Sequence, residues 1–211
     1  MTALTFAIQP DQLCVAMDTL VVDAENKKPL ALQRKFMVSH TMNLVVAGTG
    51  LASLINAWLV RVEEMQDVQD IDGLNTVAPT ELRELAPRCF GFDQITATLY
   101  HFGYSRNEAK YVGYAYRSEK SFQSDRIPEG LGLKPVIPVT PTDDIQFPDF
   151  LVKIMLEQQR QDSLLPVSEQ VGIGGEIEFV VMAEGSIRLA TVHRFASYEF
   201  ETQYIQTHGA A

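Results

Sequence analysis

Short apolar runs separated by polar turns dominate the first 47 residues. The runs at 4–8 and 13–22 flank a polar turn at 9–12, which predicts a β-hairpin. Two further strands are predicted at 35–38 and 43–47, around a turn at 39–41. Together these four strands predict an antiparallel meander. Their runs are apolar at consecutive positions, which is typical of strands covered on both faces.

The apolar period changes after Gly48-Thr49-Gly50. From Leu51 to Met65 apolar residues recur at spacings of three and four, which predicts one face of an amphipathic helix. A second helix is predicted around Pro79 to Ala86, with Thr80 as its N-cap. A third is predicted from Asp149, as N-cap, to about Gln161.

Strand patterns return in the second half of the chain. They occur at 95–102, 111–116, 176–182 and 187–193, while 126–148 carries five prolines and is expected to be irregular. Runs of strands that alternate with runs of helices indicate a layered α+β fold. We therefore expect two stacked sheets with helices outside, in one domain over residues 1–211.

Charge and composition exclude several classes of partner. The 211 residues include 17 Lys and Arg against 27 Asp and Glu, a net charge of −10. An acidic chain is a poor ligand for nucleic acid or for an anionic membrane. No apolar run approaches the ~20 residues that span a bilayer, the N-terminus lacks a signal-peptide pattern, and two cysteines fit a reducing compartment. These features predict a cytoplasmic protein.

Motifs for metal, nucleotide or serine-hydrolase chemistry are not found. The four histidines are scattered and show no metal-ligand spacing, so we expect no cofactor. The Gly48-Thr49-Gly50 segment has two interpretations. It is either an ordinary tight turn or a cradle whose backbone N–H groups bind an oxyanion or a phosphate.

Four elements near the N-terminus follow one another in a recognisable order. These are Thr2, Asp18 within Ala16-Met17-Asp18, Lys35 before Phe36, and Ala47-Gly48 before a helix. A paired glycine, Gly174-Gly175, precedes a late strand. The pattern resembles the N-terminal-nucleophile (Ntn) hydrolases of the proteasome type, which comprise proteasome β-subunits and the bacterial heat-shock-locus peptidase. The resemblance implies a four-layer αββα sandwich of two antiparallel sheets and a homo-oligomer such as a ring.

The resemblance also implies a catalytic chemistry. The hydroxyl of Thr2 would attack the carbonyl of a peptide or small amide, with the chain's own α-amine as base. Lys35 would supply positive charge, Asp18 would hold Lys35, and the Gly48 N–H would bind the oxyanion. All of this requires removal of Met1, because Thr2 otherwise has an amide nitrogen and no base.

Several positions depart from the family pattern. Arg34 occupies the place of the family's lysine, with Lys35 just after it, and Leu131 stands where the family has a serine. Gln170 and Ile173 replace an aspartate and a serine before the paired glycine. An alternative is therefore a catalytically inactive subunit with a structural role, in which Thr2 is an ordinary N-terminal residue. Under either hypothesis an acid inside an apolar strand needs a partner, so we expect Asp18 to pair with Lys35 or Arg34.

Overall fold

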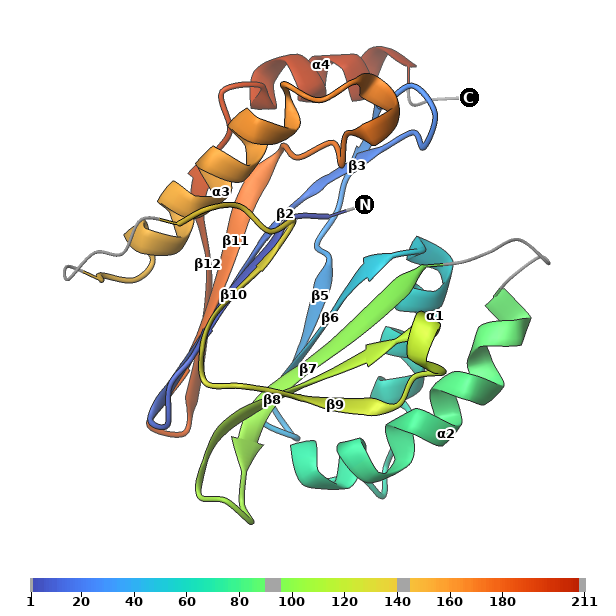
Figure 1. The fold of residues 1–211 in the computed structure, drawn as a ribbon, viewed down its shortest axis with the longest axis vertical. Coiled ribbons are helices and arrows are strands. Elements are labelled where there is room, and N and C mark those ends of the chain that lie inside the picture. Colours follow the sequence, from blue (N-terminus) through green and yellow to red (C-terminus); the bar gives the residue numbers. More distant parts are fainter. Residues whose placement is uncertain (1, 90–95, 140–144, 209–211) are drawn as a thin grey trace.

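Two five-stranded antiparallel sheets form the centre of the molecule (Figure 1). The computed structural model describes residues 2–89, 96–139 and 145–208. The first sheet has the order β10 (Gly130–Lys134), β1 (Leu4–Ile8), β2 (Gln12–Asp18), β11 (Glu176–Ala183) and β12 (Ser186–Arg194). The second has the order β5 (Phe36–Ser39), β6 (Leu44–Gly50), β7 (Ala97–Ser105), β8 (Lys110–Arg117) and β9 (Ser124–Ile127).

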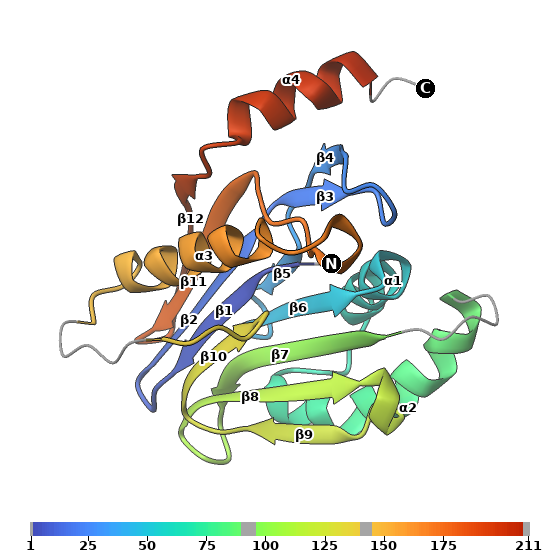
Figure 2. The same cartoon turned by 45° about the horizontal axis from the view of Figure 1, so that its top comes forward.

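Helices cover the outer face of each sheet. Helices α1 (Ala52–Glu63) and α2 (Ile71–Cys89) cover the second sheet, and α3 (Asp149–Asp162) covers the first (Figure 1). A two-stranded ribbon, β3 (Leu20–Val22) with β4 (Pro29–Leu32), contacts the last helix, α4 (Tyr198–His208), which Figure 2 shows projecting above the sheets. Short 3-10 turns lie at Ser118–Lys120 and Val167–Glu169. The result is the expected αββα sandwich.

Three hydrophobic layers hold these elements together. Phe6, Val15 and Phe102 pack between the two sheets. Trp58 belongs to the layer under α1 and α2, and Met155 to the layer under α3. Each fully buried large side chain contributes about 1.5–3 kcal/mol of hydrophobic transfer free energy. No helix in the described ranges is long and apolar enough to cross a bilayer.

The predicted hairpins are both present, but they do not form one meander. The β1–β2 hairpin belongs to the first sheet and β5–β6 to the second, because the chain crosses between the sheets through the β3–β4 ribbon. The segment 48–50 is also not a turn. It is the end of β6, where Gly48 lies opposite Leu99 of β7.

The second helix begins earlier than predicted. It starts at Ile71 and contains Pro79, so Thr80 is an interior residue and not an N-cap. Its start is marked by Asp70, whose Oδ1 accepts the Gly73 N–H at 3.0 Å. Helix α3 likewise begins at Asp149 itself, with Pro148 as the capping residue.

Three strands and one helix were not predicted. Strand β4 lies between two predicted strands, β9 and β10 overlap the stretch expected to be irregular, and α4 follows the last predicted strand. Residue 95 of the predicted strand 95–102 lies outside the described residues, and the rest of that run falls within or next to β7.

Candidate active site

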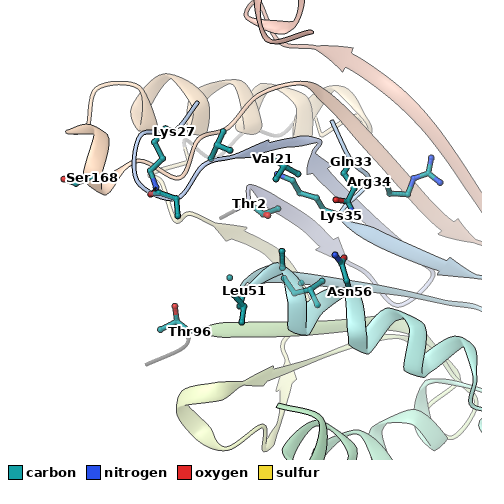
Figure 3. A pocket seen from close by; sticks show the side chains of 16 residues that line it. Thr2, Val21, Lys27, Gln33, Arg34, Lys35, Leu51, Asn56, Thr96 and Ser168 are labelled. Atoms are coloured by element: carbon teal, nitrogen blue, oxygen red, sulfur yellow. Dashed lines mark hydrogen bonds between the residues drawn. The ribbon is translucent and has the colours of Figure 1, made fainter. Parts of the chain in front are cut away.

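A cavity of about 570 Å³ opens beside Thr2 (Figure 3). Its walls come from the N-terminal segment, the β3–β4 ribbon, residues 33–35, the end of β6 and the start of α1. Three of the four sequence-predicted site residues, Thr2, Lys35 and Gly48, line this cavity. The fourth, Asp18, lies behind Lys35.

Thr2 is held by the backbone of its neighbour. The Ala3 N–H donates to Asp18 Oδ1 at 2.9 Å, and the Asp18 N–H donates to the Ala3 carbonyl at 3.4 Å. Thr2 itself is only 8% exposed. It lies two residues before the start of β1. Met1 lies outside the described residues. The paired hydrogen bonds fix the chain that carries the Thr2 hydroxyl.

Asp18 is fully buried and accepts three hydrogen bonds. Besides Ala3, Lys35 Nζ donates to Oδ2 at 2.9 Å and the Gly174 N–H donates to Oδ2 at 3.4 Å. Burial raises the pKa of Asp18, while the Lys35 ammonium and the two backbone N–H groups lower it. Asp18 therefore connects Lys35, the N-terminal segment and the paired-glycine segment.

Lys35, and not Arg34, is the partner of Asp18. Its side chain is 10% exposed, and its ammonium also donates to the Leu20 carbonyl. Arg34 instead forms a bidentate pair with Glu178 of β11, with its Nη2 2.8 Å from Oε1. The expected buried ion pair of Asp18 is present, and of the two predicted partners, Lys35 and Arg34, it is Lys35 that forms it. Lys35 itself lies one residue before β5.

Gly48 lies where β6 loses one of its neighbours. Strand β5 pairs with β6 only as far as Ala47, so from Gly48 onward that edge of β6 lies beside the cavity. A Cβ atom at Gly48 would lie 2.6 Å from Ile55 Cγ1 of α1. Glycine here allows the close approach of α1 to the strand.

Three of the positions that depart from the family pattern have their contacts elsewhere in the structure. Leu131 lies in β10 opposite Ala7, toward the far end of β1 from Thr2, so it does not take the place of the family's serine. Ile173 packs in the hydrophobic layer under α3. The Gln170 amide donates to the Leu165 carbonyl within its own loop.

Sequence reasoning missed two buried carboxylates that fix the paired-glycine segment. Glu201 of α4 accepts the Gly175 N–H at 2.7 Å, and Asp162 of α3 accepts the N–H groups of Val171 and Gly172 at 2.6 and 2.9 Å. Both side chains come from polar helix ends that carry no apolar periodicity. Glu201 lies 26 positions from Gly175 and Asp162 lies 10 positions from Gly172, so spacing along the chain does not identify either contact.

Metal ligation has no support in the described part of the chain. There, no three His, Cys, Asp or Glu side chains come together in a way that could hold an ion. Cys14 is buried in β2, and burial raises the pKa of its thiol to about 11. The cavity brings together the hydroxyl-bearing Thr2, the ammonium of Lys35 and the backbone at Gly48.

Two solved structures are similar to this chain over almost its whole length. One is the Anbu (Gly-1) mutant from Hyphomicrobium sp. strain MC1, with a TM-score of 0.64, 14% identity, and coverage of 98% of this chain and 94% of that one. The other is Anbu (ancestral beta-subunit) from Yersinia bercovieri, with a TM-score of 0.63, 13% identity, and coverage of 99% and 94%. The chain has the Ntn-hydrolase fold.

Sequence comparison adds nothing to this result. No protein-family model matches the chain, and no curated protein matches it. Similarity at 13–14% identity shows that the strands and helices are arranged in the same way. It does not show the roles of individual side chains.

Proposed function

We propose that this chain is an N-terminal-threonine hydrolase that cleaves amide bonds in peptides or small amides, in a single Ntn-hydrolase-like domain. The observation that carries the proposal is the buried Asp18–Lys35 pair beside Thr2, at a cavity large enough for a substrate. Burying an ion pair costs desolvation free energy. Here the pair holds the Lys35 ammonium at the wall of the cavity that Thr2 also lines.

The proposed reaction begins after removal of Met1 frees the Thr2 α-amine. That amine takes the proton of the Thr2 hydroxyl as Oγ1 attacks the amide carbon. The Gly48 N–H and the Lys35 ammonium stabilise the oxyanion. Collapse expels the amine, which receives the proton, and leaves an ester on Thr2. Water activated by the same α-amine then hydrolyses the ester and regenerates the hydroxyl.

Asp18 acts through Lys35 in this scheme. It holds the ammonium in place and also holds the backbone of Ala3, so one carboxylate positions both the charged group and the chain next to the nucleophile. A free α-amine has a pKa near ~7.7–8.0, which suits a base at neutral pH.

A second candidate is a catalytically inactive subunit with a structural role in a homo-oligomer. Ile173 favours it, because this residue replaces a polar family residue and packs into a hydrophobic layer, where it offers no polar group to the site. The similar protein from Yersinia bercovieri is described as an ancestral β-subunit, a component of an assembly. Assembly of this chain with copies of itself is proposed under either candidate.

Two measurements separate these candidates. The intact mass of the protein from its native cell shows whether Met1 is removed, since only its loss creates the base. Hydrolysis of fluorogenic peptides and amides is then compared between wild type and Thr2→Ala. We expect loss of Met1 and at least about a thousandfold slower hydrolysis in the variant. Quantitative retention of Met1, or hydrolysis unchanged by Thr2→Ala, would exclude catalysis at Thr2.

A further inference from the structure

The cavity beside Thr2 has a charge opposite to that of the whole chain. Three cationic side chains line it, Lys27, Arg34 and Lys35, and no Asp or Glu does so among the described residues. The chain as a whole carries a net charge of −10. A positively charged cavity wall favours anionic ligands, even though the chain as a whole is negatively charged.

Two of the three cations already have carboxylate partners. Lys35 pairs with Asp18 and Arg34 with Glu178. In the ranges that the structure describes, no carboxylate lies within ion-pair distance of Lys27. Its amine donates to the Ala24 carbonyl at 2.9 Å, and an ammonium has three donors. Lys27 therefore retains both charge and hydrogen-bonding capacity at the cavity.

The turn between β3 and β4 fixes the backbone of Lys27. Asp23 Oδ1 accepts the N–H groups of Glu25 and Asn26 at 2.9 and 3.0 Å, and the Asp23 carbonyl accepts the Lys27 N–H at 3.2 Å. Lys27 has a φ of 58°, a left-handed conformation that is unfavourable for a residue other than glycine. The hydrogen-bonded turn holds the lysine in this conformation.

Figure 3 shows Thr2 between Lys27 on one side and Lys35 and Arg34 on the other. Between these charges the lining is largely apolar, with Val21, Leu51 and Ile55 among its residues. We propose that the cavity takes peptides in which a side-chain carboxylate is recognised by Lys27 while neighbouring apolar residues cover the wall. This inference rests on the proposed function, because it names the substrate class of the same site.

The test uses the full-length protein and peptides with blocked ends. Hexapeptides of alanine and leucine, acetylated and amidated, carry one Glu moved through the six positions, and a matched set carries Gln. Binding is measured by calorimetry with wild type, Lys27→Met, Lys27→Arg and Lys28→Met. Lys28 is the matched control because it is the next residue of the turn, is exposed and does not line the cavity.

We expect the best Glu peptide to bind wild type about tenfold more tightly than its Gln counterpart, since a hydrogen-bonded charge pair contributes about 1.5 kcal/mol. Lys27→Met should abolish this preference, Lys27→Arg should retain most of it, and Lys28→Met should leave it unchanged. Equal binding of the Glu and Gln sets to wild type would overturn the inference. So would an equal loss of preference in the Lys27 and Lys28 variants.

Hydrolysis of the same peptides separates this inference from the proposed function. If binding shows a Glu preference that depends on Lys27 but no peptide is hydrolysed, the cavity recognises anions and the proposed hydrolase function is wrong. Hydrolysis that depends on Thr2 but proceeds equally with Glu and Gln peptides would leave the enzyme and remove the role of Lys27. In a further set whose C-termini are left free, a preference for the C-terminal carboxylate in place of Glu would likewise overturn the side-chain assignment.

Discussion

At the scale of single residues, Asp18 joins three parts of the candidate site. Its two carboxylate oxygens accept donors from Ala3, Lys35 and Gly174, which belong to segments far apart in the sequence. Its side chain has no solvent exposure, and that of Lys35 has 10%. Removing either charge would leave the other buried without compensation, which is the costly case for an ion pair.

The substitution Asp18→Asn tests this arrangement. An amide keeps one acceptor oxygen but removes the negative charge and directs an NH₂ group toward existing donors, so we expect a loss of about 3 kcal/mol in the free energy of unfolding. Urea denaturation measures it. Asp23→Asn, in an exposed turn where an amide oxygen can still cap the backbone, should leave the free energy of unfolding nearly unchanged. Similar losses for the two variants would contradict the buried-pair interpretation.

His101 is a second buried titratable group, remote from the cavity lining. Its Nε2 accepts the Trp58 Nε1–H at 2.8 Å, and Nδ1 has no partner among the described residues. Burial lowers the pKa of His101 to about 3. The imidazole therefore stays neutral in the folded protein, whereas in the unfolded chain it takes a proton near pH 6.5.

This difference predicts a loss of stability in acid. Between pH 6.5 and pH 3 the unfolded state binds more protons, so the contribution of His101 falls as pH decreases, by about 2 kcal/mol at pH 5 relative to pH 7. His101→Gln keeps an acceptor for Trp58 but does not titrate. Its free energy of unfolding should therefore change less between pH 7 and pH 5, by about 2 kcal/mol. Parallel pH profiles for wild type and His101→Gln would refute this assignment.

At the scale of elements, the last helix supports the site through the paired glycines. Glu201 of α4 is 5% exposed and holds the Gly175 N–H, while the adjacent Gly174 N–H reaches Asp18. Side-chain atoms at Gly174 would collide with Glu201, since a Cβ there would lie 2.2 Å from its Oε1. Helix α4 thus anchors the start of β11 behind the candidate site.

Glu201→Ala should release that anchor. The buried Gly175 N–H loses its acceptor, which costs about 1–3 kcal/mol. Amide hydrogen exchange should then become faster at residues 174 and 175. Glu199→Ala on the exposed part of the same helix serves as the matched control. Exchange at the paired glycines that is unchanged in Glu201→Ala, or raised equally in both variants, would show that α4 does not hold this segment.

The sequence correctly predicted the elements whose own apolar residues show a helix-like or strand-like pattern. Helix α1 and the β1–β2 hairpin are examples, since their burial follows the spacing of their side chains. Strand β10 has no such pattern. It forms because its backbone pairs with β1, and Gly132 leaves the room that the Phe6 ring occupies. Helix α4 was missed for a related reason, because its one buried residue is a carboxylate.

In the candidate site, too, some contacts could be predicted from the local sequence and others depend on residues far away in the chain. The pairing of Asp18 with a lysine followed from the cost of an acid inside an apolar strand, and the structure contains that pair. The choice of Lys35 over Arg34 depends on Glu178, which is 144 positions from Arg34 in the sequence. Contacts of Lys27 with the cavity likewise depend on how the β3–β4 ribbon folds over it. No spacing rule along the chain contains this information.

At the scale of the whole molecule, helix α1 offers a surface for self-association. Its outward positions include Ala52, Ser53, Asn56 and Val60, and Val60 is 56% exposed. The nearby charge of Arg61 is paired with Glu81 of α2 at 2.9 Å. Apart from the exposed Glu63 at its end, this face of α1 is uncharged, and we expect its short side chains and Val60 to pack against the same face of another copy.

Sedimentation velocity at micromolar concentration tests this association. We expect wild type to sediment as a homo-oligomer and Val60→Glu to shift toward the monomer, because the new charge would be buried without a partner in the contact. Leu164→Glu is the control, since Leu164 is 72% exposed just beyond the end of α3 and away from α1. A stable monomer for wild type would refute self-association. An oligomer that withstands Val60→Glu, or that both substitutions dissociate equally, would place the contact elsewhere than on α1.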